Sequence, residues 1–206
     1  MDGAVRGRID KRQAILAAAF AVFAREGYAL AAMDVIAAEA GVAKATVYSH
    51  FGDKETLLRA AIAAEADRTL AGNLAAVEQL SPHGGQVRGM LEDVGLRLLR
   101  CYLDERAWAV RRLLLAEINQ FPDLLDIVEG AASDRVTEAL ADRMARLTVA
   151  GRLRVTDPLL AAEQFAALLL GPMDKRSRLG TREVPDAELQ AVARAAVRTF
   201  LQAFGA

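Results

Sequence analysis

The stretch that decides the fold runs from Met33 to Leu58 and reads MDVIAAEAGVAKATVYSHFGDKETLL. Ile36, Ala37 and Ala40 recur at helical spacing and form one apolar face. Gly41 follows them, and glycine commonly ends a helix because it enters the left-handed region without strain. Lys44–His50 is too short to be stable as a lone helix, so its neighbours must hold it in place. The stretch therefore predicts a short helix, a tight turn, a second short helix and, from Asp53, the start of a longer helix.

The second short helix is predicted to turn polar side chains outward. Val47 and Phe51 are four residues apart and share a face that can enter a core. Tyr48 is one residue from Val47, so one helix face cannot bury both equally. Two short helices joined by a glycine turn match the helix-turn-helix unit of DNA-binding proteins. Short alanine-rich helices also occur in ordinary bundles, where Tyr48 would be a core aromatic. The side chains left mainly on the outer side are Lys44, Thr46, Tyr48, Ser49 and His50.

A longer pattern surrounds this unit. Gly41-Val42-Ala43-Lys44-Ala45-Thr46-Val47-Tyr48-Ser49-His50-Phe51, followed by Lys54-Glu55 and Leu57-Leu58, resembles the signature of the TetR family of bacterial repressors. The resemblance implies an all-α protein of about nine helices. Residues 1–55 would form a three-helix helix-turn-helix domain, and residues 56–206 a larger helical bundle for effector binding and dimerisation. Glu117–Leu124 and Gly151–Phe165 also resemble a C-terminal domain type found in a subgroup of these regulators.

The resemblance also implies a function. The protein would be a ligand-responsive regulator of transcription, a homodimeric repressor released from a near-palindromic operator in double-stranded DNA by a small hydrophobic effector. By resemblance, Tyr48 and Lys54 hold phosphates, with Thr46 and His50 beside them. The positions nearest the base edges would be Lys44, Ala45 and Ser49.

The sequence departs from its relatives at two helix starts. Relatives usually carry Thr or Ser in the link that ends at Ala32, and again at Ala43, where the hydroxyl caps the following helix. A missing cap costs about 1 kcal/mol. Asp34 can offset part of that cost through the helix dipole. The recognition unit is therefore expected to be loosely held in the absence of DNA.

The net charge of the chain gives only weak support for DNA binding. The chain has 206 residues and a formal net charge of −1, and residues 1–70 contain nine Lys or Arg and nine Asp or Glu. A DNA-binding domain usually carries a basic patch. Arg6, Arg8, Lys11 and Arg12 cluster near the N-terminus, where residues 1–8 are expected to be a mobile arm that reaches DNA or a frayed tail. This balance leaves open a second hypothesis, a dimeric helical scaffold with weakened DNA binding.

Few residues support catalysis, a cofactor or a metal. The histidines are His50 and His83, far apart in sequence, and no metal-ligand, phosphate-loop or nucleophile motif is present. A helical-bundle enzyme is thus the weakest alternative. The lone cysteine, Cys101, forms no internal disulfide and is expected to be a small buried hydrophobe. The N-terminus has no signal-peptide core and no apolar run is long enough to span a membrane, so a cytoplasmic protein is expected.

Helical periodicity predicts the remaining elements. Asp157 before Pro158 is an N-cap followed by proline at the first helical position. Ser81–Gly85 is the strongest predicted loop. The helices are expected over 10–26, 53–79, 86–103, 105–119, 123–149, 158–170 and 185–204.

Two further sites are implied by the resemblance. An effector pocket would lie among the helices between residues 53 and 149, and the dimer would form through the last two long helices. For each of these residues the other interpretation is packing in the chain's own core. The pocket candidates are Met90, Val94, Trp108, Arg112, Leu115, Asn119 and Phe121, and the dimer candidates are Leu168, Leu169, Val192, Ala193, Ala196 and Phe200.

Overall fold

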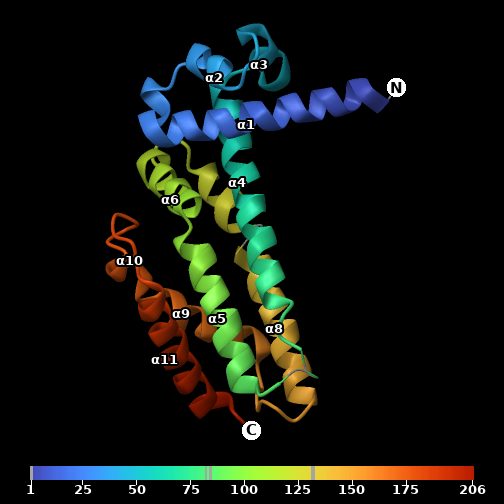
Figure 1. Ribbon diagram of the computed structural model, residues 1–206, viewed down its shortest axis with the longest axis vertical. Helices are drawn as coiled ribbons and strands as arrows, with labels where there is room; N and C mark the ends of the chain where they lie inside the picture. The colour runs from blue at the N-terminus through green and yellow to red at the C-terminus, as the bar shows by residue number, and fades with distance from the viewer. Residues whose placement is uncertain (1, 82, 84, 131–132) are drawn as a thin grey trace. The chain divides into compact units, whose positions relative to one another are not determined.

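The computed structural model describes the backbone of residues 2–81, 83, 85–130 and 133–206, with side chains except at 2–8, 129, 130 and 133. Within these residues all regular structure is helical (Figure 1), so the all-α prediction is confirmed. The first elements are α1 (Asp2–Leu30), α2 (Met33–Glu39), α3 (Lys44–Phe51), α4 (Lys54–Val77), α5 (Val87–Leu103) and α6 (Glu105–Glu117). They are followed by α7 (Asp123–Leu125), the π-helical turn η1 (Asp126–Gly130), α8 (Ser133–Val149), α9 (Pro158–Leu170), α10 (Met173–Arg176) and α11 (Asp186–Phe204).

The chain divides into two compact units, each built from two segments. Unit 1 comprises Met1–Asp67 and Ala109–Gly130, and unit 2 comprises Arg68–Trp108 and Ala131–Ala206. The division differs from the expected one at residue 55, because most of α6 and all of α7 group with the helix-turn-helix segment. The long helix α4 contributes residues to both units.

Unit 1 is organised around the buried face of α1. Ile15, Phe20 and Phe23 are buried. They pack in one cluster with buried residues of α2, α3, α4, α6 and α7, which include Ile36, Val47, Phe51, Leu57, Ile62, Leu113 and Leu124.

The ends of α1 differ from the prediction. Gly27 has φ 77° and ψ 165°, so the regular helix stops there as expected, although one further turn follows to Leu30. At the other end the helical backbone begins at Asp2 rather than Asp10. The expected arm over residues 1–8 is therefore helical from residue 2. The side chains of Arg6 and Arg8 lie outside the described residues.

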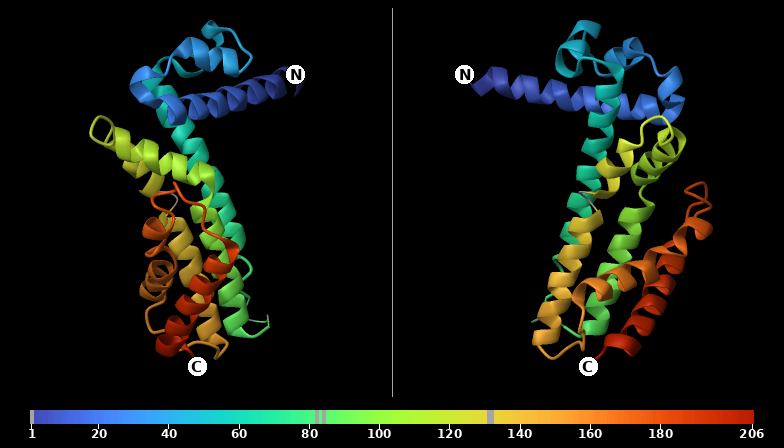
Figure 2. Two further views of the ribbon diagram at one scale, coloured as in Figure 1. Left: turned by 60° about the vertical axis from the view of Figure 1, so that its left-hand side comes forward. Right: turned by 180° about the vertical axis from the view of Figure 1, so that it is seen from behind.

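Unit 2 has a separate core of long helices. α9 lies against α8, α5 and α11, and α11 lies against α5 (Figures 1 and 2). Gly95 of α5 permits this approach, because a Cβ there would meet a methyl of Leu169 at 3.0 Å. The rings of Phe165 and Phe200 meet edge to face at 5.1 Å. The core also contains Leu91, Val94, Leu98, Leu140, Met144, Leu147 and Val197.

The segment 123–149, expected as a single helix, is helical at every described residue but is not one regular α-helix. The structure has the short α7, the π-helical turn η1 that ends at Gly130, and then α8; residues 131 and 132 lie outside the described range. Glycine is a poor helix former because its backbone loses the most conformational freedom on ordering. The π-helical turn also ends where the chain passes from unit 1 to unit 2. Leu124 packs in the first core and Leu140 in the second, so the apolar positions on either side of the π-helical turn belong to different clusters.

Among the described helices, none combines the length and the apolarity that crossing a lipid bilayer requires.

Candidate nucleic-acid interface

α3 presents one side to the core of unit 1 and the other to solvent. Val47 and Phe51 are fully or almost fully buried, whereas Tyr48 is 42% exposed. The predicted assignment of Phe51 to the core is confirmed, and so is the outward position of Tyr48. Thr46 and His50 are half-buried on the flanks. The outward face of α3 consists of Lys44, Ala45, Tyr48 and Ser49.

The two short helices begin without side-chain caps. Ala32 and Ala43 occupy the N-cap positions of α2 and α3, and neither helix start receives a side-chain hydrogen bond at its cap. In contrast, Asp53 caps α4, because its Oδ1 accepts a hydrogen bond of 2.7 Å from the Thr56 backbone N–H. This bond lowers the pKa of Asp53. α2 and α3 are thus held in place mainly by packing, and α4 also by its cap.

Lys44, the first residue of α3, forms an ion pair with Asp34 in the first turn of α2. The Lys44 Nζ lies 2.9 Å from Asp34 Oδ1, and both side chains are at least half exposed. Hydrogen bonding to the Asp34 carboxylate raises the pKa of Lys44. The pair places an ammonium and a carboxylate together at the edge of the outward face of α3.

Lys54, the predicted phosphate ligand, contacts the last turn of α1. Its Nζ donates a 3.3 Å hydrogen bond to the Ala29 carbonyl oxygen and lies 4.6 Å from the centre of the Tyr28 ring. A cation over an aromatic face is attracted by the negative charge of the ring. Because Lys54 remains half-exposed, one ammonium group can contact this last turn of α1 and still face solvent.

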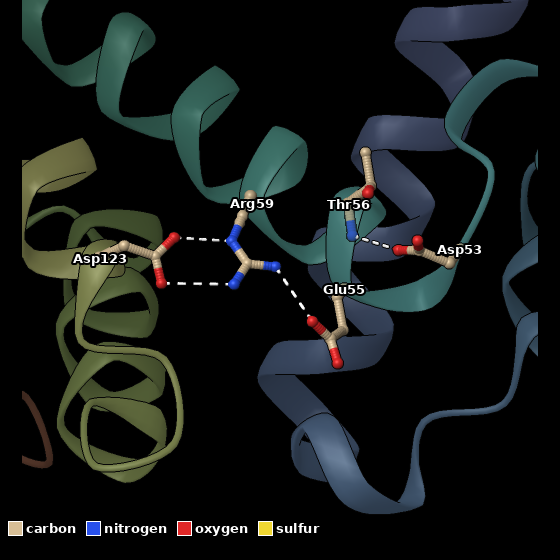
Figure 3. Close-up of polar contacts among 5 residues, drawn as sticks. All are labelled: Asp53, Glu55, Thr56, Arg59 and Asp123. Carbon is tan, nitrogen blue, oxygen red and sulfur yellow. Dashed lines mark hydrogen bonds and ion pairs between the residues drawn. The ribbon is translucent and has the colours of Figure 1, made fainter.

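A polar cluster in unit 1 was not anticipated. Arg59 of α4 donates from Nε to Asp123 Oδ2 at 2.6 Å and from Nη2 to Oδ1 at 3.3 Å (Figure 3). The same guanidinium contacts Glu55 at 3.4 Å and lies over the Phe121 ring at 5.3 Å. Hydrogen bonding from Arg59 lowers the pKa of Asp123.

A second contact joins the same segment to the last turn of α1. The backbone N–H of Tyr28 donates to Glu117 Oε1 at 3.1 Å, and the Tyr28 ring meets Phe121 edge to face at 4.7 Å. Together with Arg59–Asp123, these contacts tie the end of α6 and the start of α7 to the helix-turn-helix segment. Glu117, Arg59 and Asp123 carry no local sequence signal for this role, since their partners are 64 to 89 residues away.

The seven pocket candidates fall in different units. Met90, Val94 and Trp108 belong to unit 2, where Val94 and Trp108 are buried. In unit 1, Phe121 is buried against Tyr28, whereas Leu115 is 66% exposed. The other two candidates of unit 1, Arg112 and Asn119, are also exposed.

The six dimer candidates lie on α9 and α11 of unit 2. Leu169, Ala193 and Phe200 are buried in the core of that unit. Leu168, Val192 and Ala196 line a surface groove of about 260 Å³. The groove is completed by Pro172, Arg176, Ala191, Ala195 and Thr199. Sequence reasoning missed the outward row Ala191, Ala195 and Thr199, although its four-residue spacing marks one helix face.

The structure gives little support for a metal site or for a reactive cysteine. Over the described ranges, no group of three or more His, Cys, Asp or Glu side chains is placed to hold a metal ion. Cys101 is half-buried, and burial raises the pKa of its thiol. A raised pKa keeps the thiol protonated and poorly nucleophilic near neutral pH.

Comparison with known proteins agrees with this geometry. The family profile of bacterial regulatory proteins of the tetR family matches residues 15–61, and that of the AefR-like transcriptional repressor C-terminal domain matches residues 89–206. The HTH-type transcriptional activator FasR from Mycolicibacterium smegmatis is 34% identical over 85 residues. That match covers 41% of this chain and 39% of FasR, so the chain spans well under half of this relative.

Two solved structures resemble the chain along nearly its whole length. A protein from Mesorhizobium loti, assigned to the TetR family of transcriptional regulators, superposes with a TM-score of 0.90 at 30% identity, covering 97% of this chain and 98% of that one. The Flavonoid-responsive Regulator FrrA superposes with a TM-score of 0.73 at 26% identity, covering 95% and 97%. The chain therefore belongs to the TetR family of bacterial regulatory proteins and is a helix-turn-helix transcriptional regulator, not an enzyme.

Proposed function

We propose that the protein binds a near-palindromic operator in double-stranded DNA as a homodimer and represses transcription until a small hydrophobic effector releases it. The observation that carries the DNA-binding step is the outward face of α3, where Lys44, Tyr48 and Ser49 are exposed while Val47 and Phe51 anchor the helix. Such a helix fits the major groove, with Lys44, Ala45 and Ser49 nearest the bases. Tyr48 and Lys54, with Thr46 and His50 beside them, face the phosphates.

The short recognition helix supports a dimer. α3 has eight residues and exposes few polar side chains, so one copy makes too few base contacts for tight binding. Two-fold dimers solve this by binding two half-sites one helical turn apart. The groove on α9 and α11, with the small residues Ala191 and Ala195 on its rim, allows close approach of a second copy. Light scattering at micromolar concentration should give twice the chain mass of 22.1 kDa.

DNA binding is tested by selecting fragments from a genomic library with the full-length protein. The bound fragment is then titrated by fluorescence anisotropy at two salt concentrations, because phosphate contacts give affinities that fall as salt rises. Tyr48→Phe keeps the ring and removes the hydroxyl, so affinity for the selected fragment should fall about tenfold if that hydroxyl donates to a phosphate. If no fragment is enriched and binding does not depend on salt, the protein is a helical scaffold instead.

The sign of regulation has its own test. The match of residues 89–206 to a repressor-type domain supports repression, whereas the relative FasR is described as an activator. A reporter placed behind the selected fragment should fall in output when the protein is co-expressed. A rise in output would make the protein an activator. Since its target is chromosomal DNA, the protein would act in the cytoplasm.

The effector is proposed to bind unit 2. Its candidate contacts Met90, Val94 and Trp108 are apolar, which suits a hydrophobic, drug-sized compound. The description of FrrA as flavonoid-responsive supports a small-molecule signal in a similar structure. α4, which contributes to both units, is the proposed lever between effector and DNA.

Trp108 is the single tryptophan, so its fluorescence reports binding directly. A panel of aromatic and aliphatic compounds is screened by Trp108 quenching, and the affinity of any hit is measured with and without saturating operator. Linkage requires each ligand to weaken the other by the same factor, typically about 5- to 150-fold. Equal ligand affinities in the two titrations would leave a DNA-binding protein that is regulated in another way.

A further inference from the structure

The Asp34–Lys44 ion pair lies on the proposed interface, whereas three other cations of unit 1 contact groups outside the outward face of α3. Lys54 is engaged with Ala29 and Tyr28, and Arg12 lies over the Phe51 ring at 5.5 Å. Arg25 bonds Glu39 of α2 at 2.7 Å. Lys44 alone among these projects from α3 itself, and its partner is a carboxylate that is exposed on the same side.

The Asp34–Lys44 pair is expected to contribute little to the stability of the fold. Both side chains are exposed, 50% for Lys44 and 68% for Asp34, and exposed ion pairs contribute little to folding. Neither group caps a helix, since α2 and α3 begin without side-chain caps. A neutralised lysine also adds little to phosphate binding, because non-specific affinity comes from cations that displace counterions.

The chemistry of the pair fits a base pair instead. In the major groove guanine presents the acceptors O6 and N7, and cytosine presents the donor N4. Guanine O6 and cytosine N4 are joined by a hydrogen bond and so lie about 2.9 Å apart. Lys44 Nζ and Asp34 Oδ1 present a donor and an acceptor at 2.9 Å, so the ammonium can donate to guanine while the carboxylate accepts from cytosine.

We propose that Asp34 and Lys44 act together as one base-reading pair that selects a G·C pair in each half-site. This inference rests on the proposed operator binding and adds Asp34 of α2 to the residues that determine specificity. The carboxylate repels phosphates wherever the protein sits on DNA and is compensated only where a base amino group meets it. Asp34 therefore lowers non-specific affinity and sharpens discrimination.

The test compares Asp34→Ala and Asp34→Asn with the wild-type full-length protein. Each is titrated with the selected operator, with scrambled DNA and with an operator in which single G·C pairs are changed, at two salt concentrations. Asp34→Ala should bind scrambled DNA more tightly, show a salt slope steeper by about one, and lose about 5- to 100-fold discrimination at one G·C position per half-site. Asp34→Asn should shift the preferred base from cytosine toward adenine, because an amide pairs with adenine N6 and N7.

Glu39→Ala is the matched control, because it removes a carboxylate from the same helix whose partner is Arg25 rather than Lys44. It should raise affinity for scrambled DNA without changing base preference at any position. Circular dichroism melting confirms that each variant is folded.

One result would overturn the proposal. Asp34→Ala and Asp34→Asn could raise the affinity for operator DNA and for scrambled DNA by the same factor, as Glu39→Ala should. In that case Asp34 only repels DNA through its charge. A wild-type protein that enriches no sequence at all would instead refute operator binding itself, so the two failures are distinguishable.

Discussion

Substituting Gly180 by alanine should destabilise unit 2 through two separable effects. Gly180 has φ +80°, in the left-handed region, where an L-residue costs about 1–2 kcal/mol. An added Cβ would also lie 2.5 Å from Cγ and Cδ2 of Trp108 and 3.0 Å from its Cβ. The Trp108 Cβ is bonded to the backbone, so rotating the ring alone does not relieve the contact. Overpacking of this kind costs about 1–3 kcal/mol.

The ring of Trp108 also has neighbours that limit its retreat. It meets Tyr102 edge to face at 5.9 Å, and the Tyr102 hydroxyl donates a 2.7 Å hydrogen bond to the Asp174 carboxylate. Adding the backbone and packing effects, Gly180→Ala should lower the free energy of unfolding by roughly 2–5 kcal/mol.

Gly151→Ala supplies the control for the backbone effect. Gly151 lies in the same unit with φ +69°, and a Cβ there meets no atom within 4 Å. Its substitution should therefore show the conformational cost alone, about 1–2 kcal/mol. Guanidinium unfolding followed by Trp108 fluorescence measures both variants with the same probe. The difference between them isolates the contact with Trp108.

If Gly180→Ala and Gly151→Ala lower the free energy of unfolding equally, the reasoning is wrong. That result would mean that Trp108 moves away from the added Cβ without loss of stability. If Gly180→Ala is as stable as wild type, the left-handed backbone conformation at this position is also contradicted.

Three further outcomes follow from unit 1. Lys54→Ala should weaken binding to operator and scrambled DNA alike and reduce the salt slope by about one in anisotropy titrations, whereas Lys175→Ala in unit 2 should change neither. Ala43→Ser supplies the missing cap of α3 and should raise the free energy of unfolding of unit 1 by about 1 kcal/mol in thermal melts; no gain would show that the serine hydroxyl does not reach the first turn. Arg59 lowers the pKa of Asp123, so their pair stabilises the fold above the ordinary aspartate pKa of about 3.9 and loses that effect as pH falls through the lowered value. Asp123→Asn should therefore be less stable than wild type in urea at neutral pH, with a gap that narrows on acidification; a pH-independent gap would contradict this.

Much of the candidate interface could be read from local sequence. Val47 and Phe51 are four residues apart, and that spacing alone puts them on one helix face, which the structure buries. The absence of side-chain caps at Ala32 and Ala43 could also be predicted from the sequence, because a cap depends on the side chain at one position and on the next turn of backbone. Asp157 is predicted as a cap for the same reason, and Asp53 is predicted to begin a helix; each accepts a hydrogen bond from the backbone N–H three residues on.

The partners of the charged residues could not be read in this way. Periodicity shows which face of a helix is apolar, but it does not say which distant element covers that face. Arg59 and Asp123 are 64 residues apart, and the contact exists only because the segment after α6 folds into unit 1. The sequence places Lys44 on the outer side of α3 but does not show its partner. In the structure the turn at Gly41 brings Asp34 Oδ1 of α2 within 2.9 Å of Lys44 Nζ.

The π-helical turn η1 between α7 and α8 also lies where the two cores meet different parts of one segment. Helical spacing continues through residues 123–149, so pattern alone favoured one helix, but Leu124 and Leu140 pack in the cores of different units. Local propensity decided which segments are helical and which faces are apolar. Tertiary packing decided which core each apolar face enters and which charges meet, because those outcomes depend on contacts between residues far apart in the chain.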